Sequence, residues 1–152
     1  MDPHDNRPLV CRDDLARLPY LTWNAFVDLL ASAEYDGLTR LQRPAWLAFW
    51  YDAEVQNGGH RQFFKNRGTY RIEETIEALT RVGATGQGAV LQRAAQLYEA
   101  ATRAPEGASE GAPELTDAFD ALDRDYHRCS PEVHEILESY LEDHLEGFVR
   151  IA

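Results

Sequence analysis

The sequence predicts an all-α protein, built as an irregular bundle of six to seven helices. Apolar residues recur at spacings of three and four along most of the chain, which is the period of an amphipathic helix. No segment shows the strict alternation of a half-buried strand. Aliphatic and aromatic residues make up 44% of the 152 residues, enough for a sizeable core in one domain.

Helical stripes account for most of the first 103 residues. The first predicted helix contains Trp23 to Leu30, with Thr22 as its cap. The second begins at either Thr39 or Pro44 and ends at Asn57. Three further helices are expected, over 60–66, 72–82 and from 91 to about 103.

The rest of the chain is predicted as a flexible loop over 104–113 followed by an acidic helical pair over 114–152. The last helix is expected to start with Ser130 as cap and Pro131 in its first turn, and to continue through Phe148. We therefore expect a single domain over 1–152, with N-terminal helices over 1–38 and a central helical core over 39–103.

Charge is distributed unevenly. The chain has 26 acidic and 15 basic residues, a formal net charge of −11. Residues 106–152 alone contain 13 acids and 3 bases. Such a surface repels nucleic acid and attracts basic partners through a field that salt screens.

Two helices in this region are expected to present rows of carboxylates. We call the predicted set the acidic face; it consists of Asp117, Asp120, Asp123, Glu135, Glu138, Glu142 and Glu146. Successive turns of a helix lie about 5.4 Å apart, and B-DNA presents a phosphate roughly every 3.4 Å along each strand. Two adjacent acidic helices could therefore imitate two rows of phosphates. A solvated outer face that only keeps the protein soluble is the alternative.

The segment from Asp52 to Asn66 predicts a tight corner between two helical pieces, because Gly58 and Gly59 follow Asn57. Glu54 lies in the last turn of the first piece, where the helix dipole disfavours an anion. Its carboxylate is expected either to accept hydrogen bonds from free backbone N–H groups of the next helix or to pair with a base. The candidate bases are Arg61, Lys65, Arg67 and Arg71, which could instead form an anion patch.

Two interpretations of this corner stay open. In one, Glu54, Asn57 and His60 form an acid–base group in a pocket lined by Trp50 and Phe64. In the other, they fix the angle between two helices. The second is favoured, because no nucleophile or second carboxylate accompanies them.

The same segment resembles the C-terminal-domain family of the DNA-mimic proteins, whose members share a motif E-x-x-N-G-G followed by aromatic residues and an Asn. The matching residues are Glu54, Asn57, Gly58, Gly59, Phe63, Phe64 and Asn66. His60 departs from the pattern, since an aromatic residue is common there. The similarity covers most of the chain from about Thr39 onward. It implies a mimic of double-stranded DNA that binds a basic DNA-binding protein.

No cofactor or metal site is predicted. His134 and Glu138 share a helix face, but a metal site needs three or four convergent ligands. Cys129 stands near His127 and the start of a helix, yet it lacks a designated base and an oxyanion site. Cys11 and Cys129 have no metal-type spacing, which indicates two free thiols in a cytoplasmic protein. The sequence contains neither a signal-peptide pattern nor the roughly 20 apolar residues that cross a bilayer.

The leading hypothesis is a non-enzymatic protein that binds a basic protein surface, such as that of a DNA-binding protein or transcription factor. It is not expected to bind nucleic acid or a membrane directly. One alternative is a small-molecule-binding or hydrolytic protein that uses a pocket behind Glu54 and Asn57. An immunity-type toxin inhibitor is another. The oligomeric state is left open.

Overall fold

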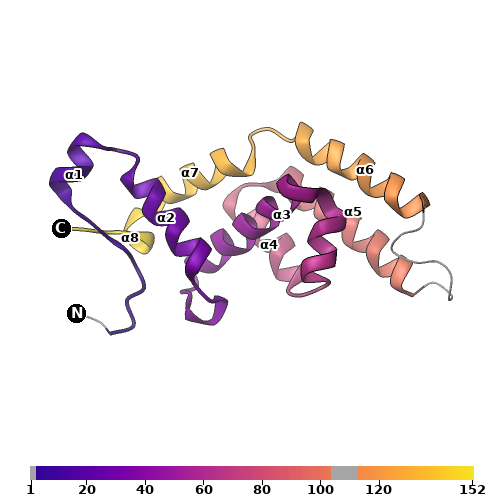
Figure 1. Cartoon of the computed structure of the whole chain (residues 1–152), viewed down its shortest axis with the longest axis horizontal. Helices are drawn as coiled ribbons and strands as arrows, with labels where there is room; N and C mark the ends of the chain where they lie inside the picture. The colour runs from indigo at the N-terminus through magenta and orange to yellow at the C-terminus, as the bar shows by residue number, and fades with distance from the viewer. Residues whose placement is uncertain (1–2, 104–112) are drawn as a thin grey trace.

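The computed structural model describes residues 3–103 and 113–152, and these residues are helical almost throughout (Figure 1). They form eight α-helices, one 3-10 helix and two short strands. In chain order the elements are β1 (Leu9–Val10), α1 (Arg12–Arg17), α2 (Leu21–Ser32), η1 (Tyr35–Gly37), α3 (Gln42–Arg67), α4 (Ile72–Val82), α5 (Thr85–Thr102), α6 (Pro113–Arg128), α7 (Val133–Asp143), α8 (Leu145–Phe148) and β2 (Arg150–Ile151). The all-α fold class is confirmed.

Helix α3 is the central element. It contacts α2, α4, α6 and α7, and α5 packs between α4 and α6. Ala45, Ala48 and Tyr51 of α3 are fully enclosed by these neighbours. The buried apolar side chains of all the larger helices join into one contiguous core.

The start of α3 has both of the predicted features, a cap at Thr39 and a proline in the first turn. The Thr39 N–H donates to Gln42 Oε1 at 3.0 Å and the Gln42 N–H donates to Thr39 Oγ1 at 3.3 Å, which is a reciprocal capping box. Pro44 lies in the first turn of the helix. Gln42 is fully buried, and its side-chain N–H groups also donate to Asn6 Oδ1 and to the Gly147 carbonyl. It therefore joins both ends of the chain to the central helix.

The last predicted helix is divided in two. His144 has non-helical backbone angles (φ −130°, ψ 29°), so α7 ends at Asp143 and α8 begins at Leu145. Beyond α8 the chain turns back, and β2 pairs in parallel with β1, with Leu9 opposite Arg150 and Val10 opposite Ile151. Pairing with the N-terminal segment requires this change of direction. The prediction of one continuous helix to Phe148 is wrong for that reason.

Two predicted caps are also wrong. Helix α2 starts at Leu21, and the Thr22 hydroxyl donates to the Pro19 carbonyl instead of accepting a backbone N–H. Helix α7 starts at Val133, so Ser130 and Pro131 precede it. The Pro131 carbonyl accepts a hydrogen bond from Gln87 Nε2 at 2.9 Å, which anchors this turn to α5.

The predicted loop over 104–113 lies outside the described residues except for its last position, which is the first residue of α6. Within the described part of the chain, no helix has the length and apolar character needed to cross a membrane.

Candidate functional site

The predicted corner is a kink inside α3. Gly58 (φ −158°, ψ 19°) and Gly59 (φ 72°, ψ −172°) both leave the helical conformation. The Gly59 angles lie in a region that is essentially restricted to glycine. A Cβ on Gly59 would also lie 2.3 Å from Asp123 Oδ2 of α6. Glycine is therefore required at this position both by the backbone and by the close approach of α6.

The Glu54 carboxylate joins the two halves of the kinked helix. Its Oε2 accepts hydrogen bonds from Gln62 Nε2 at 2.8 Å and from Asn66 Nδ2 at 2.9 Å. Arg67 Nε lies 3.8 Å from its Oε1. Asn57 Nδ2 donates to Gln62 Oε1 at 3.2 Å. The Glu54 carboxylate was expected either to accept hydrogen bonds from free backbone N–H groups or to pair with a base. The structure shows the pairing with a base, and the hydrogen bonds come from side-chain amides.

A buried polar chain holds the kink against α6. Asp123 Oδ1 accepts from the His60 backbone N–H at 2.9 Å and lies 2.6 Å from His60 Nδ1. The other ring nitrogen, Nε2, lies 2.6 Å from the Tyr51 hydroxyl. Burial raises the pKa of Tyr51 well above its ordinary value, so the hydroxyl keeps its proton and donates to Nε2. His60 Nδ1–H then donates to Asp123, and all three groups are satisfied.

The hydrogen-bonded side chains Asp123, His60 and Tyr51 place an acid, an imidazole and a hydroxyl in the order used by nucleophilic enzymes. Their position inside the core prevents catalysis by this group. Both His60 and Tyr51 are fully buried, so no substrate reaches either side chain. Their surroundings are aromatic, with Phe63 and Tyr126 at edge-to-face angles to the Tyr51 ring. His60 therefore fills an aromatic position in the core and also supplies the two hydrogen bonds that fix the kink.

Asp123 should make the stability of the protein depend on pH. Burial alone would raise its pKa, but the hydrogen bonds from the His60 ring and backbone outweigh this effect, and the pKa is lowered. A carboxyl group whose pKa is lowered by folding stabilises the native state above its unfolded pKa of about 3.9 and loses that effect as the pH falls. We expect the difference in unfolding free energy between the parent and Asp123→Asn to shrink from about pH 5 to about pH 3. Urea unfolding at each pH measures it, and a difference that grows on acidification contradicts the assignment.

The corner residues should differ in their effect on stability. Glu54 is mostly buried (side chain 14% exposed) and accepts two hydrogen bonds, whereas Asn57 is exposed and donates one. A hydrogen bond to a charged group contributes roughly 1.5–3 kcal/mol. We expect Glu54→Gln to lower the unfolding free energy by about 1–2 kcal/mol, and Asn57→Ala by less than about 1 kcal/mol. Equal losses in thermal unfolding would show that Glu54 does not hold the kink.

The predicted acid–base group is not assembled around one pocket. A hollow of about 530 Å³ lies beside the kink, and its lining includes Gly58, Arg61, Gln62, Phe64, Lys65, Asn66, Tyr98 and Phe119. Glu54, Asn57 and His60 are not part of this lining. Trp50 lies elsewhere, with its Nε1–H donating to the Leu30 carbonyl. The described lining contains no carboxylate or imidazole that could act as a general base.

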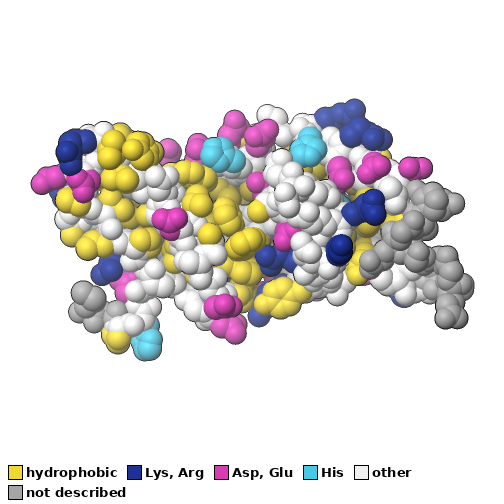
Figure 2. Space-filling model, viewed as in Figure 1, with side chains coloured by type: hydrophobic (Ala, Val, Ile, Leu, Met, Phe, Trp, Pro, Cys, Tyr) yellow, Lys and Arg dark blue, Asp and Glu magenta, His cyan; other side chains and the backbone are white. Residues whose placement is uncertain are grey.

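The acidic face is divided over three helices. Asp117 and Asp120 are exposed on α6, and Glu135, Glu138 and Glu142 are exposed on α7. These two helices follow one another along the upper edge of the molecule in Figure 1 instead of lying side by side. Figure 2 shows carboxylates over both helices and a group of basic side chains at the top of the molecule over α6. The expected pair of parallel rows is therefore replaced by one interrupted line.

Two members of the predicted face lie elsewhere. Asp123 points toward α3 and is bonded to His60, as described above. Glu146 is on α8, beyond the break at His144, where its backbone carbonyl accepts a hydrogen bond from Arg7 Nη1. Arg124 and Arg128 are exposed on the C-terminal half of α6. The uninterrupted part of the line is α7.

The weaker candidates gain no support as reactive groups. Burial raises the pKa of the Cys129 thiol, which opposes formation of a nucleophilic thiolate. Cys11 and Cys129 are both free thiols. His134 Nε2 lies 2.9 Å from Glu138 Oε1 on the surface of α7. No cluster of three metal-ligating side chains occurs in residues 3–103 and 113–152.

The spacing of the acidic residues places Asp123 in the solvent-exposed row and does not connect it with His60. A signal was present, since Asp123 lies four residues after the buried Phe119 and next to the buried Leu122. Both relations place it at the edge of the packed side of α6. The second signal was His60 itself, because it stands at a position where an aromatic residue is common in the family that the sequence resembles.

The fold and the corner together describe an acidic, all-helical protein whose central helix is kinked at Gly58 and Gly59. A family model described as "DMP19-like protein" matches residues 36–144, and the chain belongs to this family. The match includes the kink, α4, α5 and the described parts of α6 and α7. Comparison with curated proteins and with solved structures gave no match.

Proposed function

We propose that this protein binds the DNA-binding surface of a basic protein, with the α7 carboxylates Glu135, Glu138 and Glu142 in the place of DNA phosphates. The DMP19-like family suggests DNA mimicry in general. The observation that carries the proposal for this chain is the composition of α7. Its outer face is exposed and acidic, and no Lys or Arg occurs between Cys129 and Arg150.

The inner face of α7 explains why these carboxylates are held in a fixed row. Val133, Ile136, Leu137, Tyr140 and Leu141 are buried against the core. The Tyr140 hydroxyl donates to the Leu41 carbonyl at 2.9 Å, which ties the helix to the start of α3. A rigid helix presents charges at fixed intervals without the ordering cost that a flexible acidic tail would have on binding.

The length of the acidic line suits a duplex. At about 1.5 Å per residue, α6 and α7 are roughly 24 Å and 16 Å long. Together they span about 40 Å, roughly twelve base pairs at 3.4 Å each. Asp117 and Asp120 lie near one end of this line and the α7 carboxylates occupy the other. A protein that contacts about one turn of DNA could therefore meet carboxylates at both ends of its binding surface.

A capture experiment tests the proposal. The protein is immobilised, a lysate of its source organism is applied at low salt, and bound proteins are eluted with a short DNA duplex. We expect the duplex to release at least one DNA-binding protein that a salt step also releases. If the duplex releases nothing that salt releases, the mimicry proposal is wrong. Release of a toxin that lacks affinity for DNA would favour the immunity-type alternative.

A further inference from the structure

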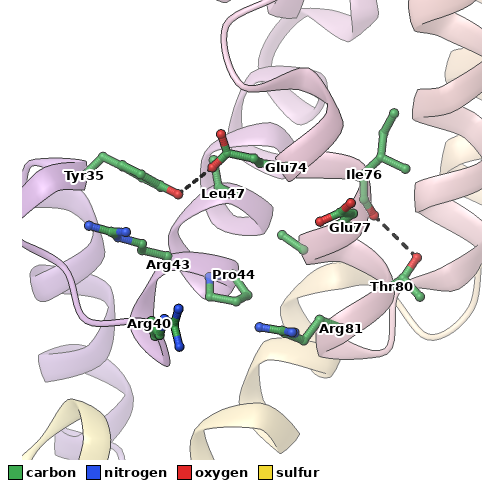
Figure 3. A pocket seen from close by; sticks show the side chains of 11 residues that line it. Tyr35, Arg40, Arg43, Pro44, Leu47, Glu74, Ile76, Glu77, Thr80 and Arg81 are labelled. Atoms are coloured by element: carbon green, nitrogen blue, oxygen red, sulfur yellow. Dashed lines mark hydrogen bonds between the residues drawn. The ribbon is translucent and has the colours of Figure 1, made fainter.

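A second hollow, of about 630 Å³, lies between the start of α3 and helix α4 (Figure 3). It is bounded by Tyr35 from η1, by Arg40 and Arg43 around the start of α3, and by α4 residues up to Arg81. Figure 3 shows the Arg81 side chain extending from α4 toward the wall that carries Arg40. Three guanidinium groups, two around the start of α3 and one from the end of α4, thus line one hollow.

None of these three guanidinium groups has a hydrogen-bond or ion-pair partner among the described residues. The side chains of Arg40, Arg43 and Arg81 neither donate a hydrogen bond to a described residue nor lie within 4.0 Å of a described carboxylate. Arg43 Nε is buried and has no acceptor. The Arg43 guanidinium lies over a ring, with its Cζ 4.8 Å from the centre of Tyr35, and its charge helps to lower the pKa of Glu74. A buried donor without an acceptor is costly, so Arg43 Nε favours a ligand that supplies an acceptor. Arg40 and Arg81 are exposed and add positive charge at the rim of the same hollow.

The charge balance inside the hollow is positive although the chain as a whole is strongly negative. The lining contains two carboxylates, Glu74 and Glu77. Glu74 is already engaged, because Arg71 Nη1 lies 3.0 Å from its Oε1 and the Tyr35 hydroxyl donates to its Oε2 at 2.7 Å. Glu77 has no hydrogen-bond or ion-pair partner among the described residues. Three guanidinium groups that also lack such a partner there therefore share the hollow with one unpaired carboxylate.

The rest of the lining is partly apolar, with Pro44, Leu47 and Ala78 beside the charged groups. A hollow of this size, apolar with a few placed polar groups, is typical of sites for small organic molecules. Guanidinium groups bind phosphate through paired hydrogen bonds. Three of them can balance the double negative charge of a phosphate monoester. A ligand with a single carboxylate would leave most of the positive charge of the three groups unbalanced.

We propose that this hollow binds a small organic molecule through its phosphate group, which Arg40, Arg43 and Arg81 contact. The apolar wall of Pro44, Leu47 and Ala78 contacts the organic part of the ligand, and Glu77 accepts a hydrogen bond from a hydroxyl or amino group on it. Nucleic acid is a poor ligand for this hollow, because a polyanion would also meet the repulsion of a chain with net charge −11. This site is independent of the acidic α7 surface.

Titration with inorganic phosphate and with phenyl phosphate, followed by backbone amide NMR at constant ionic strength in chloride, tests the proposal. We expect shifts confined to residues around 35–47 and 74–81, with tighter binding of phenyl phosphate. The exposed double variant Arg40→Gln/Arg81→Gln should bind both probes at least tenfold more weakly, since it removes two charge-assisted contacts. Circular dichroism confirms that the variant is folded.

The matched control is Arg61→Gln/Lys65→Gln. It removes two other bases that have no ion-pair partner among residues 3–103 and 113–152, and these bases line the hollow beside the kink. The net charge changes by the same amount. We expect it to bind the probes as the parent does. The proposal is wrong if the parent shows no saturable shifts, if the control loses binding equally, or if the Arg40/Arg81 variant retains it. Equal affinity for the two probes would exclude a role for the apolar wall.

Discussion

Gly59→Ala should lower the unfolding free energy by about 2–4 kcal/mol, more than any other single substitution in the E-x-x-N-G-G segment. The backbone angles of Gly59 (φ 72°, ψ −172°) cost a residue with a side chain roughly 1–3 kcal/mol. The new Cβ would also lie 2.3 Å from Asp123 Oδ2. The carboxylate must therefore move away from the His60 N–H groups, which weakens two hydrogen bonds to a charged acceptor.

A second glycine, Gly68, allows the backbone strain to be measured apart from the collision with Asp123. Gly68 ends α3 with φ 54°, and a Cβ built there meets no atom within 4 Å. Gly68→Ala therefore introduces backbone strain without a collision. Urea unfolding of both variants compares them directly, and a loss for Gly59→Ala no greater than for Gly68→Ala would mean that Asp123 does not support the kink. Asp123→Ala combined with Gly59→Ala should cost less than the sum of the single changes, because both disturb the same hydrogen bonds.

Replacement of the three α7 carboxylates by Gln should weaken partner binding by roughly 10–100-fold at low salt. Each exposed ion pair contributes about 0.5–1 kcal/mol, and the three contributions together correspond to that range. The effect should be mainly a slower association, since exposed charges steer the encounter. It should shrink as salt is added, because the field is screened. Surface plasmon resonance across a salt series measures both rates.

The control for this series changes three exposed glutamates outside α6 and α7. Glu34, Glu73 and Glu99 are exposed on other parts of the molecule, and their replacement by Gln changes the net charge by the same amount. We expect this variant to retain at least about half of the parent affinity, with folding unchanged in both triple variants. Equal losses in the two variants would show that overall charge, and not the α7 row, attracts the partner.

The periodicity of the sequence predicted the fold class and most helices, because amphipathic stripes such as Leu115, Phe119, Leu122 and Tyr126 depend only on local spacing. The kink was predictable for the same reason, since two glycines after an amide are a local signal. The break at His144 was not predictable in this way. It depends on the pairing of Arg150–Ile151 with Leu9–Val10, a contact between the two ends of the chain.

The same difference between local spacing and contacts across the fold applies to the candidate sites. Spacing placed Glu135, Glu138 and Glu142 on one helix face, and the structure has all three exposed on α7. Spacing alone does not state what lies across a helix interface, so the bond between Asp123 and His60 was missed. The hollow with Arg40, Arg43 and Arg81 joins the start of α3 to the end of α4. No sequence pattern connects those residues before the chain folds.

The central claim is that the α7 carboxylates occupy the site on a partner where DNA phosphates bind. A competition titration tests it most directly, with a partner captured as described above and a fluorescently labelled duplex that the partner binds. The account predicts mutual exclusion: the protein displaces the duplex completely, and its apparent Kd rises in proportion to duplex concentration. The variant with Glu135, Glu138 and Glu142 changed to Gln should displace the duplex only at roughly 10–100-fold higher concentration. A ternary complex of partner, duplex and this protein, with the apparent Kd independent of duplex, would contradict the claim.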